Sequence, residues 1–264
     1  MQKSTKGRKR AWWEVALTLF GDIKVFPHPM FMVYDPGSYR IKGRHAREII
    51  EVVEPGDILL RSYDRYLDGR CIPGQFSHAG LYLGELTSDD SRFAPDEVEK
   101  SDFPTGSQMV IHAMADGVFA EDVLNFCRCD ELAVLRFSDP VTRCRENSGL
   151  YVERSRYEDP DEWELKMRFE REDHIAFHDA WPIVRRVALA QLGRPYDFYF
   201  DFHGTEKMSC TEFVCFCLKA LGCGIDIAPA QSRMMVFFKP TIIAPDAFLT
   251  SGLKQVWTST SQSA

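Results

Sequence analysis

One short stretch around residue 210 has the residue types and spacing that a nucleophilic cysteine requires. Ser209 and Glu212 flank Cys210 in the order Ser-Cys-Thr-Glu, directly before the apolar run FVCFCL. Ser-x-x-Glu ahead of such a run is the capping box of a helix start, in which each side chain hydrogen-bonds the other residue's amide. Cys210 then occupies the first helical position, where free N–H groups and the helix dipole favour negative charge. We therefore expect the pKa of Cys210 to lie below the roughly 8.5 of a free cysteine.

Such a cysteine needs a base, and two histidines lie on predicted strands. His78 begins the run HAGLYLG, and strand alternation places it on one face with Gly80 and Gly84. Glycine neighbours let another group approach the histidine closely. His112 lies in the run VIHAM, so antiparallel pairing of the two strands would bring the histidines side by side. The alternative is that both histidines are packed polar groups with backbone partners and that Cys210 is an ordinary buried helix residue.

The elements that must position these residues are short strands and a few helices. Apolar, β-rich runs bounded by turn residues predict strands at about 57–61, 77–84, 108–114 and 132–137. A helix is predicted over DAWPIVRRVALAQLG, with Asp179 as N-cap, Pro182 in the first turn and Gly193 past the end. AREIIEVV and AEDVLNF are expected to form short helices. Strands and helices in unequal blocks indicate an α+β domain.

Five motifs together resemble a known group of proteins. EPGDILLR, FSHAGLYLG, VIHAMADGV, LGRPYDFYF and SCTEFV occur in an order and spacing similar to the YiiX/YebB-like group. That group consists of circularly permuted relatives of the NlpC-type papain-fold cysteine hydrolases, in which the histidine strands precede the cysteine helix. The resemblance implies a circularly permuted papain-like fold, with a small antiparallel sheet packed on the helix that bears the nucleophilic cysteine.

The same resemblance assigns roles to individual residues. It makes Cys210 the nucleophile, His78 the base and His112 the third, orienting residue. Several members of the permuted group have glutamate at the third position, so His112 is a departure from them and the third role stays open. Tyr196 and Asp197 match a family stretch ahead of the nucleophile, and Tyr196 has two interpretations, an oxyanion-binding group or an aromatic packing residue. The Cys210 amide is the better oxyanion donor, because helix starts present free N–H groups.

The chemistry that follows is a cysteine hydrolase, or thiol protease, that cleaves an amide bond of a peptide-like substrate through a thioester acyl-enzyme. Two alternatives stay open. One is a lipid acyltransferase or lipase that uses the same cysteine on an acylated small substrate, as in relatives that resemble lecithin:retinol acyltransferase. The other is a non-catalytic binding module on the same fold. Neither the substrate nor the oligomeric state follows from the sequence.

Composition excludes several other classes of function. The 264 residues carry a net charge of −7, which argues against a nucleic-acid partner. Eight cysteines are too sparse for a disulfide scaffold, and no Cys/His cluster has the spacing of a zinc site. There is no glycine-rich phosphate loop, so we expect no metal and no cofactor. No stretch approaches 18 apolar residues, which argues against a transmembrane helix.

We divide the chain into three parts. Residues 1–44 form an N-terminal extension, 45–257 a single catalytic domain with surface insertions at about 85–107 and 139–173, and 258–264 a polar tail. Residues 11–20 have helical periodicity, but Glu14 interrupts the apolar run and no cleavage site follows, so we do not interpret it as a signal peptide. We therefore expect a cytoplasmic protein.

The N-terminal residues have two interpretations. The first ten residues carry a charge of +5 and precede Trp12 and Trp13, whereas the rest of the chain carries −12. The helix could pack on the domain through its aromatic face. Alternatively, residues 1–20 contact anionic lipid, with the tryptophans at headgroup depth, and the protein is peripheral to the membrane.

Overall fold

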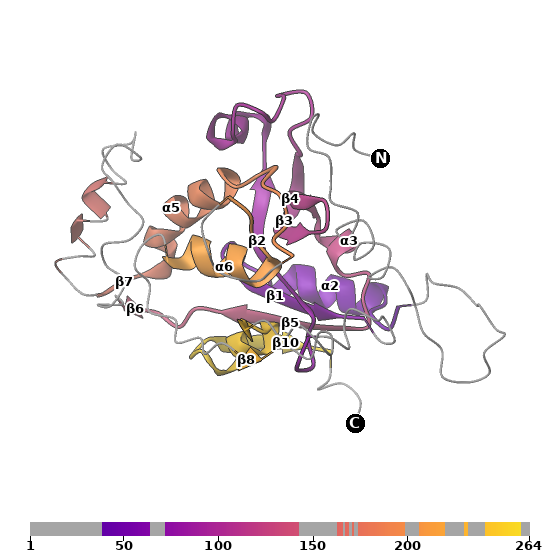
Figure 1. Ribbon diagram of the computed structural model, residues 1–264. Coiled ribbons are helices and arrows are strands. Elements are labelled where there is room, and N and C mark those ends of the chain that lie inside the picture. The colour runs from indigo at the N-terminus through magenta and orange to yellow at the C-terminus, as the bar shows by residue number, and fades with distance from the viewer. Residues whose placement is uncertain are drawn as a thin grey trace.

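A six-stranded antiparallel sheet forms the centre of the computed structural model (Figure 1). The structure describes residues 39–63, 72–142, 163–165, 167–168, 171, 174–198, 206–219, 230–231 and 241–259. The strand order is β10-β5-β1-β2-β3-β4. The bounds are β1 Ile58–Ser62, β2 His78–Leu86, β3 Gly106–Met114, β4 Gly117–Asp122, β5 Glu131–Arg136 and β10 Lys254–Thr258. Strands from both ends of the described chain therefore join one sheet.

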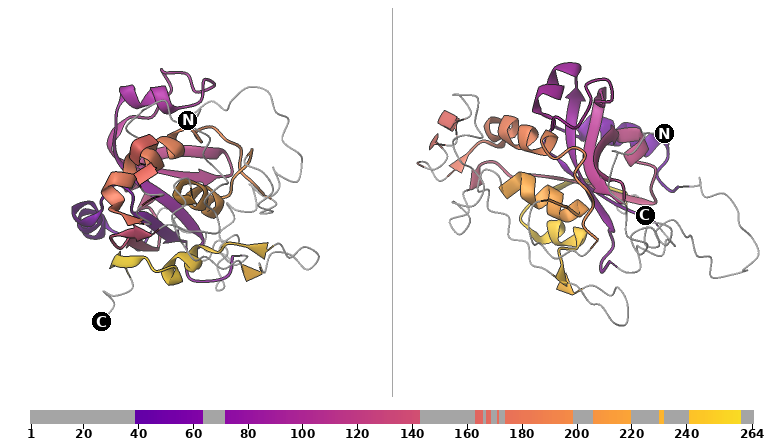
Figure 2. Two further views of the ribbon diagram at one scale, coloured as in Figure 1. Left: turned by 90° about the vertical axis from the view of Figure 1, so that its left-hand side faces the viewer. Right: turned by 45° about the horizontal axis from the view of Figure 1, so that its top comes forward.

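Helices cover both faces of this sheet. The α-helices are α2 Gly43–Val52, α3 Val123–Phe126, α5 Phe177–Leu189 and α6 Cys210–Lys219. Two 3-10 helices, η2 Ser88–Phe93 and η5 Pro245–Thr250, and two small ribbons, β6 Val141–Thr142 with β7 His174–Ile175 and β8 Ala230–Gln231 with β9 Thr241–Ile242, complete the described elements. Figure 2 shows α5 and α6, in orange, on the side of the sheet opposite to α2 and α3.

Alternating side chains of the strands build one hydrophobic cluster on each face. On β2, Leu81 and Leu83 point into the cluster that contains α5 and α6, whereas Tyr82 points into the cluster that contains Phe126 of α3. Both clusters are apolar because the central strands are buried on both sides, as their continuous hydrophobic runs require. The alternation predicted for this strand is therefore confirmed.

The four predicted strands are present, but the prediction missed β4 and β10 of the same sheet and the four strands of the two small ribbons. Residues 57–61, 77–84, 108–114 and 132–137 correspond to β1, β2, β3 and β5 within a few residues. The expected helix AEDVLNF is only partly correct: Glu121 and its neighbour Asp122 end strand β4, and the helix contains four residues, Val123–Phe126. The 85–107 segment is also not a plain loop, since it contains the end of β2, helix η2 and the start of β3.

The helix before the cysteine starts earlier than predicted. The N-cap of α5 is Ala176, and Asp179 lies inside the first turn instead of capping it. Asp179 contacts Arg168 there, so its carboxylate has a partner outside the cap. Pro182 lies inside the helix, and Gly193 follows the end of the helix with φ of 79°. The observed N-cap, Ala176, thus lies three positions before the predicted one, Asp179.

Several predictions lie outside the described residues. They include the helix at 11–20, the basic N-terminus and most of the insertion at 139–173. Within the described residues, no helix combines the length and apolar character that crossing a membrane requires.

Candidate active site

The capping box fixes the start of α6 and the place of Cys210. The Ser209 amide donates to Oε2 of Glu212 at 2.6 Å, and the Glu212 amide donates to Oγ of Ser209 at 3.4 Å. Both reciprocal contacts of the predicted capping box are present. Cys210 is the first helical residue, and its side chain is buried with 4% exposure. The apolar side of the helix, including Phe213 and Val214, packs into the cluster shared with α5.

The Cys210 sulfur reaches the sheet at the start of β2. The backbone amide of Ala79 hydrogen-bonds to the thiol, and so does that of Thr211. The antiparallel pairing of β2 with β3 begins at Leu81 opposite Ile111, so Ala79 precedes the first pair of this ladder. The two strands separate at this end, and the separation leaves the Ala79 amide free for the sulfur. His78 directly precedes Ala79, so the residue whose amide contacts the thiol is the chain neighbour of the predicted base.

The two predicted histidines lie in contact. Nε2 of His78 is 2.8 Å from Nδ1 of His112, with the rings nearly perpendicular at 84°. His112 is fully buried and His78 is 8% exposed. The antiparallel pairing of β2 and β3 places both rings on the face of the sheet that carries α3, and both rings contact Phe126 there. The pairing that the sequence left conditional is therefore the observed one.

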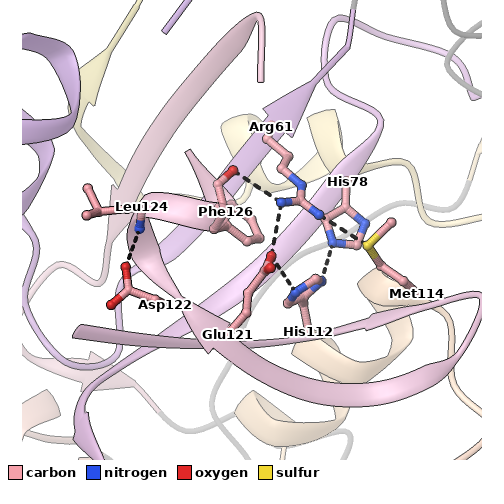
Figure 3. A network of polar contacts seen from close by, with 8 residues as sticks. All are labelled: Arg61, His78, His112, Met114, Glu121, Asp122, Leu124 and Phe126. Carbon is pink, nitrogen blue, oxygen red and sulfur yellow. Dashed lines mark hydrogen bonds and ion pairs between the residues drawn. The ribbon is translucent and has the colours of Figure 1, made fainter. Parts of the chain in front are cut away.

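Beyond the histidines the polar contacts continue to two residues that the sequence analysis missed (Figure 3). Nε2 of His112 is 3.0 Å from Oε1 of Glu121, and NH1 of Arg61 is 3.3 Å from the same oxygen. The His112 nitrogen and the carboxylate are within ion-pair distance but not aligned as a hydrogen bond. Contacts in a site without substrate are often poorly aligned and tighten on binding. A chain of contacts thus runs from His78 to Arg61.

Gly80 lets the side chains of Phe126 and Val110 approach strand β2 closely. A Cβ added there would lie 2.8 Å from the ring of Phe126 and 2.9 Å from a methyl group of Val110. Phe126 in turn supports Arg61, whose guanidinium lies 4.1 Å from the ring centroid. The space that the sequence analysis expected beside His78, because Gly80 has no side chain, is therefore occupied by the ring of Phe126.

Burial determines the protonation of the two histidines. The pKa of His78 is lowered well below 6.5, mainly by desolvation, then by the charge of Arg61 and by His112. The pKa of His112 is lowered in the same direction by desolvation and then by Arg61. Both imidazoles are therefore neutral at pH 7, as a base that accepts a proton from a thiol must be.

The prediction of a lowered pKa for Cys210 is wrong in direction. Desolvation raises the pKa of this thiol to about 11, and the charge of Glu212 also raises it. The Ala79 and Thr211 amides and Arg61 lower the pKa, but by less than burial raises it. The helix start does favour a thiolate, yet a side chain that is 4% exposed loses more hydration than these donors restore. In the free protein the cysteine is a neutral thiol.

The remaining predicted residues are placed less directly. Tyr196 packs against the hydrophobic cluster that contains α6, with its ring edge-on to Phe198 at 4.9 Å between centroids. Asp197 is buried at 5% exposure. The preceding Pro195 carbonyl accepts from the Met208 amide, which ties this segment to the residue before the cap of α6. This position suits the packing interpretation of Tyr196.

Side chains that could bind a metal do not gather into one site in the described part of the chain. No set of three or more His, Cys, Asp or Glu side chains is arranged there to hold a metal ion. Cys127 and Cys129 are both buried free thiols whose pKa values are raised by desolvation.

Comparison with known proteins gives one weak structural similarity. No family model matches the chain, and no curated protein matches it. The crystal structure of metalloprotein yiiX from Escherichia coli O157:H7, DUF1105, matches with a TM-score of 0.42 and 13% identity, over 78% of this chain and 97% of that one. This structural similarity is weak.

Proposed function

We propose that this protein is a cysteine hydrolase that cleaves an amide bond through a thioester on Cys210. One observation supports the proposal: the amide of Ala79 hydrogen-bonds to the Cys210 thiol, and Ala79 directly follows His78 in the chain. Nε2 of His78 in turn lies 2.8 Å from Nδ1 of His112. A nucleophile, a base and a group that orients the base are what this chemistry needs. The proposal includes the circularly permuted papain-like arrangement that the sequence motifs imply.

The protons can be followed through the reaction. Nε2 of His78 is engaged by His112, and Nδ1 makes no hydrogen bond to any other described residue. The proposal assigns Nδ1 as the atom that takes the proton of Cys210 as the sulfur attacks the substrate carbonyl carbon. The Cys210 amide, at the start of α6, donates to the oxyanion that forms. The proton then passes to the leaving amine, the C–N bond breaks, and water hydrolyses the thioester to release the acid and the thiol.

The raised pKa of Cys210 determines when the thiolate forms. With the thiol and both imidazoles neutral at rest, no stable ion pair precedes the substrate. Proton transfer is concerted with attack, as in the serine hydrolases, where histidine acts as a base during the chemical step. This assignment keeps the cysteine unreactive until a carbonyl is bound.

Two other functions fit the same residues. A lipid acyltransferase or lipase would form the same thioester from an acyl ester, and an acyltransferase would pass the acyl group to a second molecule. A binding module would retain the fold without turnover. The product released from the thioester distinguishes the hydrolase from the acyltransferase. The absence of any thioester would indicate the binding module.

Intact-mass measurement tests the proposal. Full-length protein is incubated with small amide- and ester-based acylating probes, because a cysteine with 4% exposure is best reached by small electrophiles. The expected result is one added acyl group, absent in Cys210→Ala and retained in Cys215→Ala. Cys215 is the matched control, since it lies on the same helix and is also buried, at 5%.

The products then separate the candidate functions. Free acid supports the hydrolase, whereas acyl transfer to an added lipid alcohol supports the acyltransferase. Labelling that persists in Cys210→Ala, or no labelling of the folded protein by either probe, would sink the proposal.

A further inference from the structure

Arg61 is a buried cation at the end of the contact chain that starts at His78. The residue is 2% exposed, and it is the strand partner of His78 in the β1–β2 ladder. NH1 of Arg61 donates to the Phe126 carbonyl at 3.1 Å and to Oε1 of Glu121 at 3.3 Å. A buried charge needs partners of this kind, and here a carboxylate and a carbonyl supply them.

The chemistry of arginine determines how Glu121 behaves. Guanidinium groups only donate hydrogen bonds, so Oε1 of Glu121 accepts one from Arg61. The same oxygen lies 3.0 Å from Nε2 of His112. If Nε2 carried a lone pair, two electron-rich atoms would face each other inside the protein. The contact is favourable only when Nε2 of His112 carries a hydrogen, whose positive end then lies near the Glu121 carboxylate although the two are not aligned as a hydrogen bond.

This hydrogen position propagates to the second ring. A neutral imidazole has one N–H, so His112 with Nε2–H has a bare Nδ1 that accepts. Nδ1 of His112 is 2.8 Å from Nε2 of His78, and this contact therefore requires Nε2–H on His78. Nδ1 of His78 is then bare as well. That is the nitrogen available to take a proton from Cys210.

We propose that Arg61 and Glu121 are positioning residues that fix the tautomers of both histidines and so leave Nδ1 of His78 free to act as base. The inference rests on the proposed function for its catalytic meaning, but the tautomers exist whether or not the protein turns over a substrate. Glu121 touches neither the thiol nor a substrate in this arrangement, and it acts through His112.

Protonation of Glu121 would reverse the hydrogen positions on both histidine rings. A carboxylic acid could donate to Nε2 of His112, which would move the hydrogens to Nδ1 of both rings and remove the base. Burial raises the pKa of Glu121, and the charged groups that face it, Arg61 from β1 and Arg128 after α3, lower the pKa by less. His112, from β3, is the neutral group in contact. The two arginines thus oppose the effect of burial and favour the carboxylate that these tautomers need.

Nitrogen NMR of histidine-labelled, full-length protein tests the tautomers directly. Two-bond proton–nitrogen spectra at pH 7 report which ring nitrogen carries the hydrogen. The expected result is Nε2–H for both His78 and His112. A hydrogen on Nδ1 of either ring in the wild type overturns the inference, and this measurement needs no variant to fold.

Two variants of Glu121 then separate positioning from structure. Glu121→Ala removes the acceptor and should mix the tautomers of His112, whereas Glu121→Gln keeps an oxygen that accepts and should retain Nε2–H. The rate of Cys210 acylation should fall by about 10- to 100-fold in Glu121→Ala, less than the about 10²–10⁴ of a lost general base, and recover in Glu121→Gln. Asp122→Ala is the matched control, because Asp122 caps α3 through the Leu124 amide at 2.8 Å.

The outcomes distinguish this inference from the proposed function. Unchanged tautomers and rate in a folded Glu121→Ala overturn the positioning role while the hydrolase stands. Wild-type tautomers as stated, with a Cys210 that no probe acylates, support the positioning role of Arg61 and Glu121 and overturn the hydrolase instead. An equal loss in Asp122→Ala would mean that the effect is general destabilisation, which also contradicts the positioning role.

Discussion

His78 and His112 are 34 residues apart in the chain, and yet 2.8 Å separates Nε2 of one from Nδ1 of the other. The pairing of β2 with β3 produces this contact, and each ring loses its hydration to the same aromatic neighbour, Phe126. Substitution of either histidine therefore changes the surroundings of the other. The relation between the two rings gives the first prediction.

His78→Ala should reduce acylation of Cys210 more than His112→Ala. The former removes the proposed base, worth about 10²–10⁴-fold, whereas the latter removes the group proposed to orient it. Single-turnover acylation rates of the two folded variants measure the difference. Equal losses would indicate that the histidines share the role, and full activity of His78→Ala would eliminate His78 as the base.

The rate of Cys210 alkylation by iodoacetamide should rise with pH well beyond neutrality. A thiol with a pKa of about 11 gains thiolate throughout the range from pH 7 to 10, so no plateau is expected there. Peptide mapping after timed quenching gives the rate for each cysteine. A plateau between pH 5 and 8 would mean that Cys210 is a preformed thiolate, against the burial seen here.

Two substitutions of Glu212 should have different effects. Glu212→Ala removes the cap and should lower the free energy of unfolding by about 0.5–2 kcal/mol, with little effect on acylation of the folded protein. Both variants remove the charge that raises the pKa of Cys210, so alkylation at pH 8 should accelerate in both, but Glu212→Gln can still accept from the Ser209 amide and should keep the stability. Urea denaturation and alkylation rates measure the two effects. Abolished turnover at normal stability would place Glu212 in the mechanism.

Folding stability should fall as the pH drops below about 6.5. The pKa values of His78 and His112 are lowered in the folded protein, so in this range the unfolded chain binds more protons and acid favours it. Each histidine contributes a slope of about 1.4 kcal/mol per pH unit until its folded pKa is reached.

Urea denaturation from pH 7.5 downward measures this slope. Asp57 and Glu121 oppose it, because burial raises the pKa of each carboxyl group. Comparison with His112→Asn isolates one histidine, and its slope should be smaller than that of the wild type. Identical slopes would show that His112 is not buried as a neutral group.

The basic N-terminus supplies the last prediction, which concerns residues outside the described part of the chain. If residues 1–20 are an interfacial anchor, the full-length protein should sediment with anionic vesicles and less with neutral ones, because each basic residue adds about 1 kcal/mol near such a surface. A chain that starts at Asp22 should stay in the supernatant. Equal, negligible sedimentation of both proteins would leave the segment as a packed helix.

The sequence predicted those parts of the fold that have local signals. β1, β2, β3 and β5 have apolar runs between turn residues, and the α6 start has a capping box with two reciprocal side chains. β4 was missed because it runs directly into α3, and its last three residues, AED, were assigned to the predicted helix AEDVLNF. β10 was missed because QVW gives a short signal whose partner, β5, lies more than a hundred residues earlier.

The site was predicted in part for the same reason. Cys210, His78 and His112 were identified from motifs, and the structure brings His78 and His112 together with the backbone beside Cys210. Arg61 stood in a quoted motif, EPGDILLR, and a charged residue at the end of an apolar strand is a signal that could have been used. The pKa of Cys210 could not be predicted, because it depends on how many atoms surround the sulfur, which only the packed structure determines.

The C-terminal strand β10 covers the outer edge of β5, whose other side pairs with the Arg61 strand β1. A chain cut before Lys254 would leave the amides and carbonyls of β5 without these partners. Uncovered strand edges recruit other chains. Proteolytic removal of this last strand should therefore make the chain self-associate even where the contacts between His78, His112 and Glu121 stay intact.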